Sequence, residues 1–191
     1  MTFVEIINTA SLATGLLYLL LEIIQSKWMW VVGIFTGGFV AVSFALQHTW
    51  ASMGLNIYYV IMSFVGIVLW TKASKQTSKG AYHLVHLPRK VLIYSIITAA
   101  IGIPALMALL HFTHGSETAL DSVAVVLSAI GTWWLAKSYL EQWLVWIIAD
   151  TISTVLCIAL GNWWTAALYI AYTLWAVFGY YLWKRKGEYI G

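Results

Sequence analysis

The chain of 191 residues is 62% hydrophobic and 9% charged, against about 45–50% and 25% in ordinary soluble domains. A core built from a chain of this length cannot bury so much apolar surface, which excludes a soluble domain and indicates a protein that folds in a lipid bilayer. The formal net charge is +3, and the single Cys excludes a disulfide within the chain.

Seven apolar stretches of about 20 residues are each long enough to cross a bilayer as a helix. They cover residues 4–25, 28–47, 51–71, 91–111, 120–137, 140–160 and 163–183. The first stretch lacks the basic start of a secretion signal, since no Lys or Arg precedes Lys27, so we expect an uncleaved span. The sequence therefore predicts an all-α, multi-pass integral membrane protein with seven transmembrane helices.

The basic residues indicate how these helices are oriented. With seven spans, every Lys and Arg falls on one side of the membrane: Lys27, Lys72, Lys75, Lys79, Arg89, Lys90, Lys137, Lys184, Arg185 and Lys186. Because basic loops stay in the cytoplasm, we expect the N-terminus outside and the C-terminus in the cytoplasm. The basic linker between spans 3 and 4 is interpreted as a solvated topology signal that touches anionic lipid, with a specific partner site as the less favoured alternative.

An internal repeat appears when the chain is shifted by 113 residues. The shift places Trp30 on Trp143, Trp50 on Trp163, Gly66 on Gly179 and Trp70 on Trp183 without a gap. Both copies start in the cytoplasm, so the repeat is parallel and gives a 3+1+3 arrangement. We expect a first three-helix bundle at 1–72, a cytoplasmic linker at 73–90, a linker helix and outer loop at 91–118, and a second bundle with the tail at 119–191. Transporters built this way hold their substrate between the halves near mid-membrane.

Asp150 is the strongest candidate for a functional residue. It lies in the middle of the sixth span, where a carboxylate costs about 2.5–3.5 kcal/mol and by default faces a partner, a cavity or a substrate. Trp143 and Trp146 share its helix face, and aromatic rings beside a carboxylate suit an organic cation. The alternatives are a carboxylate satisfied by a neighbouring hydroxyl, and tryptophans that pack or anchor at the membrane interface.

Polar side chains in the third and seventh spans are the other candidates for the substrate site. Asn56, Tyr59 and Ser63 share one face of the third span, and Tyr169 and Tyr172 occupy the equivalent face of the seventh. These side chains either hydrogen-bond a polar ring of the substrate or hydrogen-bond neighbouring helices to each other.

Two features of the first bundle are expected to be structural. Glu22 lies near the cytoplasmic end of its span, so we expect it at the surface, beside Lys27. Gly33, Gly37 and Gly38 form a small-residue face that predicts close packing between helices.

Enzymatic function is not supported by the motifs. The chain lacks the H-E-x-x-H, G-x-S-x-G and phosphate-loop patterns, and we expect no catalytic residue, no cofactor and no nucleic-acid partner. His111, His114 and Glu117 imitate a metal site in the outer loop, but such spacing arises easily by chance, and no metal is expected. A structural or signalling membrane protein is the more distant alternative to a transporter, and saturable uptake would separate a carrier from a channel.

The tryptophan motif resembles a known family. Trp143-x-x-Trp146-x-x-x-Asp150, followed by Tyr169, Gly179-Tyr180 and Trp183, is similar to the C-terminal half of the PnuC-type vitamin transporters, and Trp50 through Gly66 and Trp70 resembles their third span. The resemblance implies a fold related to the SWEET sugar transporters, a homotrimer and a place in the bacterial inner membrane. It also implies facilitated diffusion of a vitamin, which a separate cytosolic kinase then traps by phosphorylation.

The departures from the family pattern bear on the substrate. Nicotinamide riboside carriers of this family typically have Asn at the position of Asp150, and Asn followed by Gly-Trp where this chain has Ser63 and Gly66-Ile67. The side-chain amides that would hydrogen-bond a ribose or a carboxamide are thus absent at these positions, and Asp150 adds a full negative charge. Thiamine, a permanent cation, is therefore the favoured substrate; nicotinamide riboside, also cationic, is the alternative.

Overall fold

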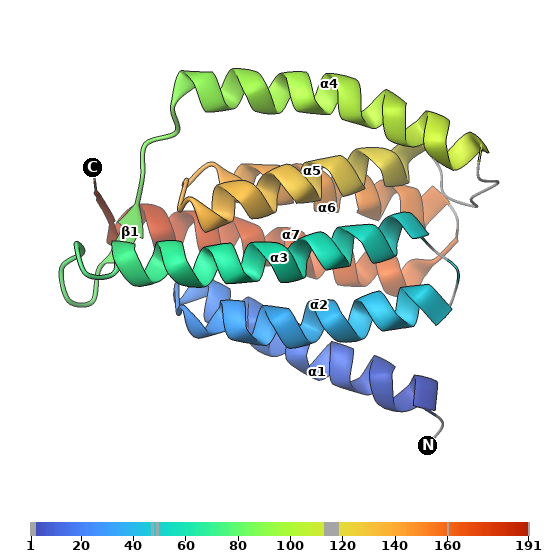
Figure 1. Ribbon diagram of the computed structural model, residues 1–191, viewed down its shortest axis with the longest axis horizontal. Coiled ribbons are helices and arrows are strands. Elements are labelled where there is room, and N and C mark those ends of the chain that lie inside the picture. Colours follow the sequence, from blue (N-terminus) through green and yellow to red (C-terminus); the bar gives the residue numbers. More distant parts are fainter. Residues whose placement is uncertain (1–2, 47, 49, 113–118, 160, 191) are drawn as a thin grey trace. The chain divides into compact units, whose positions relative to one another are not determined.

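The structure is a computed structural model that describes residues 3–46, 48, 50–112, 119–159 and 161–190. Within them lie the helices α1 (Phe3–Ile23), α2 (Trp28–Leu46), α3 (Trp50–Ala73), α4 (Arg89–Phe112), α5 (Ala119–Ala136), α6 (Gln142–Ala159) and α7 (Trp163–Lys186) (Figure 1). These helices match the seven expected spans to within a few residues, so the prediction of an all-helical membrane protein is confirmed. The sequence did not predict the strands β1 (Tyr82–Leu84) and β2 (Gly187–Tyr189), which pair with each other.

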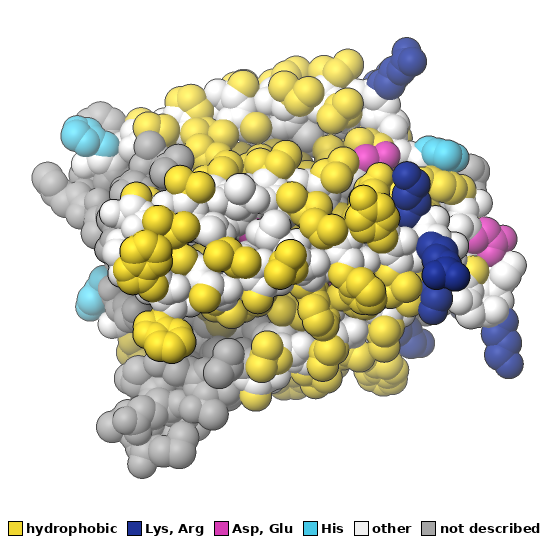
Figure 2. Space-filling view, turned by 180° about the vertical axis from the view of Figure 1, so that it is seen from behind, with side chains coloured by type: hydrophobic (Ala, Val, Ile, Leu, Met, Phe, Trp, Pro, Cys, Tyr) yellow, Lys and Arg dark blue, Asp and Glu magenta, His cyan; other side chains and the backbone are white. Residues whose placement is uncertain are grey.

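The helices carry apolar side chains on their outer faces. By length and composition, α2, α3, α4, α6 and α7 can cross a membrane, and the shorter apolar stretches Ala13–Ile23 and Ser122–Ala136 lie in α1 and α5. No residue in the most apolar stretch of α4 is buried within the chain. Figure 2 shows hydrophobic side chains along the helices, with Lys and Arg at helix ends and in loops. Such surfaces are stable when lipid covers them.

The chain divides into two compact units. Unit 1 comprises residues 1–83, 136–138 and 188–191, and unit 2 comprises residues 84–135 and 139–187. In unit 1, α2 packs against both α1 and α3. Because consecutive helices are antiparallel, the end of α1, the start of α2 and the end of α3 lie at the same end of this unit.

Two glycines allow this close packing of α2. A Cβ atom at Gly33 would lie 2.8 Å from Ser63 Oγ, and one at Gly37 would lie 3.0 Å from a Val60 methyl group. The packing predicted for these two glycines is therefore confirmed. The same prediction was wrong for Gly38, where a Cβ would have no atom within 4 Å, because this position points away from the packed face.

The hydrophobic core of unit 2 lies near the C-terminal end of α5 and the N-terminal end of α6. Trp134, Tyr139 and Val145 are buried there. The indole of Trp134 also donates a hydrogen bond to Ser95 Oγ of α4 at 3.0 Å. Elsewhere in the unit, α6 packs along α7.

One pair of tryptophans occurs in each unit with the same geometry. Trp30 meets Trp70 edge to face at 5.3 Å and 82°, and Trp143 meets Trp183 at 5.2 Å and 89°. Each first indole also lies on a glycine: a Cβ at Gly66 would lie 2.2 Å from Trp30, and one at Gly179 would lie 2.5 Å from Trp143. All these positions are related by the 113-residue shift found in the sequence.

The turns that precede these tryptophans also share a backbone conformation. Gln25 and Ser138 both have positive φ angles, of 50° and 61°. The next residue in each turn donates a backbone hydrogen bond five residues back, from Ser26 to Leu21 at 2.9 Å and from Tyr139 to Trp134 at 3.0 Å. The same shift of 113 residues relates the two turns.

Candidate functional site

Asp150 lies at the middle of α6, and its side chain is half-buried. Neighbouring hydroxyl groups serve the helix itself: Thr151 donates to the carbonyl of Ile147 at 2.6 Å, and Thr154 donates to the backbone carbonyl of Asp150 at 2.8 Å. Among the residues that the structure describes, none forms a hydrogen bond or ion pair with the Asp150 carboxylate. The carboxylate therefore keeps its capacity to bind a ligand.

Two tyrosines of α7 lie near Asp150. The hydroxyl groups of Tyr169 and Tyr172 are both close enough to the Asp150 carboxylate to interact with its charge. The centroids of the two rings are 6.0 Å apart, and the ring planes meet at 86°. The Tyr169 hydroxyl also lies near the side chain of Ser153, one turn after Asp150 on α6, whose hydroxyl donates to the Ala149 carbonyl at 3.0 Å. We call Asp150, Ser153, Tyr169 and Tyr172 the α6–α7 polar cluster. It brings together three of the residues proposed from the sequence.

Trp146 lies one turn before Asp150 on α6. Its side chain is half-buried, and its indole packs against α5, where a Cβ at Gly131 would lie 3.3 Å from the ring. Its indole N–H is buried and has no hydrogen-bond partner in the described part of the chain. A buried donor without a partner is costly, and a ligand acceptor would satisfy it.

Trp143 has a different environment from Trp146. It is 2% exposed, and its ring is enclosed by Trp183 and by the backbone at Gly179. These contacts make Trp143 a packing residue between α6 and α7. Of the two tryptophans, Trp146 is therefore the better candidate for a stacking contact with substrate.

The α3 candidates lie in unit 1, and two of them are engaged within their own helix. Asn56 donates to the Ser52 carbonyl and Ser63 donates to the Tyr59 carbonyl, both at 2.8 Å. Asn56 is 8% exposed and Ser63 is 2% exposed. These two side chains therefore occupy positions in the packed interior of unit 1.

Tyr59, the third α3 candidate, belongs to a polar group that the sequence reasoning missed. It is half-buried and lies within electrostatic range of Tyr18 of α1, which is also in range of Glu22. The surface position predicted for Glu22 was wrong, since its side chain is 4% exposed. The sequence did contain an indication of this buried position, because Glu22, like Asp150, is an acidic residue within an apolar helix. The nearby Lys27 led instead to the prediction of a surface position.

Metal binding was not expected from the sequence. Among the described residues, no group of three or more His, Cys, Asp or Glu side chains could hold a metal ion. His114 and Glu117, which imitate a metal site together with His111, lie outside the described residues.

Comparisons with known proteins identify the family. The family model described as "Nicotinamide mononucleotide transporter" matches residues 5–185. The chain belongs to this family. The resemblance to PnuC-type transporters is therefore confirmed, and the protein is a membrane transporter rather than an enzyme.

Two individual proteins illustrate the relationship. The chain is 26% identical over 186 residues to the nicotinamide riboside transporter PnuC of Haemophilus influenzae, which covers 92% of this chain and 79% of that protein. Its fold is similar to a crystal structure described as the vitamin B3 transporter PnuC. The TM-score is 0.73 at 21% identity, over 94% of this chain and 80% of the other.

Proposed function

We propose that this transporter takes up nicotinamide riboside by facilitated diffusion. The family match and the named function of the Haemophilus influenzae relative support this substrate. The observation that carries the proposal at the level of residues is the half-buried Asp150 carboxylate, which lies beside two tyrosines and one turn from Trp146.

Nicotinamide riboside takes the place of thiamine, which the sequence reasoning favoured. The comparisons name nicotinamide riboside and vitamin B3, and thiamine gains no support from them. The charge at Asp150 suits either cation, so it does not separate them. The departure at Ser63 also carries little weight, because its hydroxyl is buried and donates to its own helix.

The α6–α7 polar cluster and Trp146 form the proposed substrate site. The Asp150 carboxylate stabilises the positive charge of the pyridinium ring, and Trp146 stacks on the ring. The phenol groups of Tyr169 and Tyr172 hydrogen-bond the ribose hydroxyls. Asn56, Tyr59 and Ser63 remain the candidates from the first bundle, with Tyr59 the least buried of the three.

The proposed architecture is the 3+1+3 parallel repeat with the domain limits 1–72, 73–90, 91–118 and 119–191. The recurrence of the tryptophan pairs and of the preceding turns at one offset supports the repeat. The basic residues of unit 1 follow α1 and α3, which supports a cytoplasmic location for that end and an N-terminus outside. A homotrimer in the bacterial inner membrane, and a cytosolic kinase that traps the product, complete the proposal on the basis of family resemblance.

A binding panel tests the proposed substrate. Purified protein in detergent is titrated calorimetrically with nicotinamide riboside, thiamine and riboflavin. Nicotinamide riboside is expected to bind saturably and at least about tenfold more tightly than thiamine, a difference of about 1.4 kcal/mol. Tighter binding of thiamine would restore the order expected from the sequence and contradict the proposal.

Trp146→Ala is expected to weaken nicotinamide riboside binding by about 30-fold. A desolvated cation–π contact contributes about 2 kcal/mol, which corresponds to that factor. Trp164→Ala serves as the control, because this α7 tryptophan is 90% exposed. Equal titration curves for the two variants would remove Trp146 from the site.

A further inference from the structure

Unit 1 contains a pocket at the end that carries its basic residues. Its volume is about 370 Å³, and it is lined by the turn after α1, the end of α3 and the following loop, among them Gln25, Lys27, Trp70, Ser78, Lys79 and His83. A volume near the lower limit for ligand sites suits a small molecule. All of these residues belong to one unit, so the pocket is complete within it.

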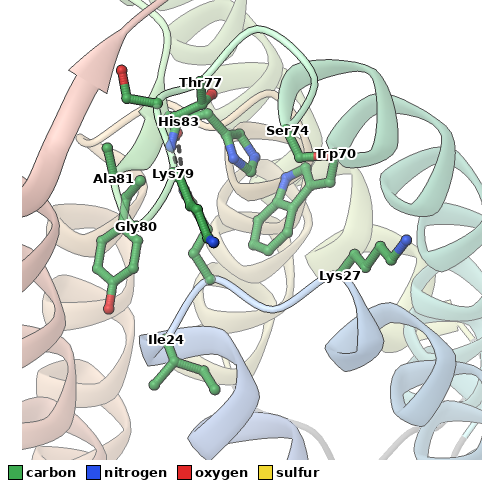
Figure 3. A pocket seen from close by; sticks show the side chains of 12 residues that line it. Ile24, Lys27, Trp70, Ser74, Thr77, Lys79, Gly80, Ala81 and His83 are labelled. Carbon is green, nitrogen blue, oxygen red and sulfur yellow. Dashed lines mark hydrogen bonds between the residues drawn. The ribbon is translucent and has the colours of Figure 1, made fainter.

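The charge of this pocket is positive. Lys27 and Lys79 line it, and neither ammonium group forms an ion pair with any residue that the structure describes. Figure 3 shows Lys79 and Lys27 on either side of Trp70, with the imidazole of His83 next to the indole. Two unpaired ammonium groups favour a ligand with two negative charges.

His83 adds a buried polar group to the pocket. Its side chain is 5% exposed, and Nε2 has no hydrogen-bond partner among the described residues. Burial lowers the pKa of His83 to about 4, so the imidazole is neutral at neutral pH. A neutral imidazole protonated at Nε2 donates to an anionic oxygen.

The backbone around His83 is held in place by Gln25. The His83 N–H donates to Gln25 Oε1 at 2.7 Å, and Gln25 Nε2 donates to the His83 carbonyl at 2.9 Å. These two hydrogen bonds join the turn between α1 and α2 to the loop that follows α3, and they position the pocket wall before any ligand binds.

The loop already holds one anionic group. The backbone N–H of Ser78 donates to Glu188 Oε2 at 3.0 Å. This contact with Ser78 holds the pKa of Glu188 below its usual range. The Ser78 N–H therefore binds an oxyanion at the wall of the pocket.

We propose that this pocket binds a phosphate monoester through Lys27 and Lys79, with Ser78 and His83 as hydrogen-bond donors. A monoester carries about −1.5 to −2 charges at pH 7, which matches two ammonium groups. One source is the phosphorylated form of the transported molecule, which arises on this side if the proposed function holds. The other source is the headgroup of a lipid with a terminal phosphate.

Calorimetric titration of the full chain in detergent tests the site, with nicotinamide mononucleotide and inorganic phosphate as probes. Lys27→Gln/Lys79→Gln is expected to weaken the binding of both probes at least tenfold. Lys72→Gln/Lys75→Gln removes the same charge from exposed positions that do not line the pocket, and is expected to change affinity less than twofold. Equal losses in the two double variants, or no binding to the wild type, would overturn the proposal.

Further measurements distinguish this site from the proposed substrate site and identify the source of the phosphate. Asp150→Asn is expected to retain inorganic phosphate binding even where it loses nicotinamide riboside. In nanodiscs, competition by phosphatidic acid but not phosphatidylcholine identifies a lipid headgroup, and undiminished nucleotide binding identifies a free metabolite. Glu188→Ala is expected to tighten phosphate binding severalfold, because it removes the competing carboxylate from Ser78; unchanged or weaker binding would exclude the part assigned to Ser78.

Discussion

Asp150→Asn is expected to weaken nicotinamide riboside binding by about 10–150-fold. A hydrogen bond or close contact that involves a charged group contributes about 1.5–3 kcal/mol, which corresponds to this range. The amide keeps the size of the side chain and removes the negative charge that stabilises the pyridinium ring. Calorimetric titration of the two purified proteins measures the difference.

The fold is expected to tolerate this substitution. No described residue donates a hydrogen bond to the Asp150 carboxylate, so the variant breaks no such bond. Its thermal unfolding temperature should stay close to that of the wild type. Glu188→Gln, which changes an exposed carboxylate, is the charge-matched control and should bind nicotinamide riboside normally. Unchanged affinity in Asp150→Asn would refute the substrate role, and a large fall in unfolding temperature would assign the carboxylate to structure.

The helices were predictable because the bilayer imposes a simple rule on the sequence. A span needs about 20 apolar residues, and its backbone must be satisfied as a helix. The ends of α3 and α7 are marked further by Lys72 and by Lys184–Lys186. The strands β1 and β2 follow no such rule, since three residues are too few to show a period of two.

Individual side chains were harder to predict than helices, because their roles depend on neighbours distant in sequence. Trp143 and Trp146 have the same local surroundings in sequence, yet one is enclosed by Trp183 and the other packs on Gly131. Glu22 was placed at the surface through a partner near in sequence, whereas its side chain is buried and lies near Tyr18, which is also close to Tyr59 of α3. Asp150 could be proposed from the sequence because a carboxylate at mid-helix in lipid is costly wherever its neighbours lie.

Trp30 and Trp143 each lie on a glycine, Gly66 and Gly179, where an added methyl group would have no room. Gly66→Ala and Gly179→Ala are each expected to destabilise the protein by about 1–3 kcal/mol, the usual cost of overpacking. The added methyl group would lie 2.2 Å from Trp30 or 2.5 Å from Trp143, and these indoles are 1% and 2% exposed. Neither rigid ring can move away, because each also meets a second buried tryptophan edge to face. Thermal unfolding in detergent, followed by tryptophan fluorescence, measures the loss.

The matched controls are Gly38→Ala and Gly54→Ala, two helical positions where a Cβ would have no atom within 4 Å. They are expected to be neutral or slightly stabilising, because Ala favours the helix by up to about 1 kcal/mol over Gly. If Gly66→Ala and Gly179→Ala match these controls, the close packing is absent. A loss in only one of them would mean that the two bundles differ at this contact. Similar losses in both support a repeat in which an indole laid on a glycine joins the second helix of each bundle to the third.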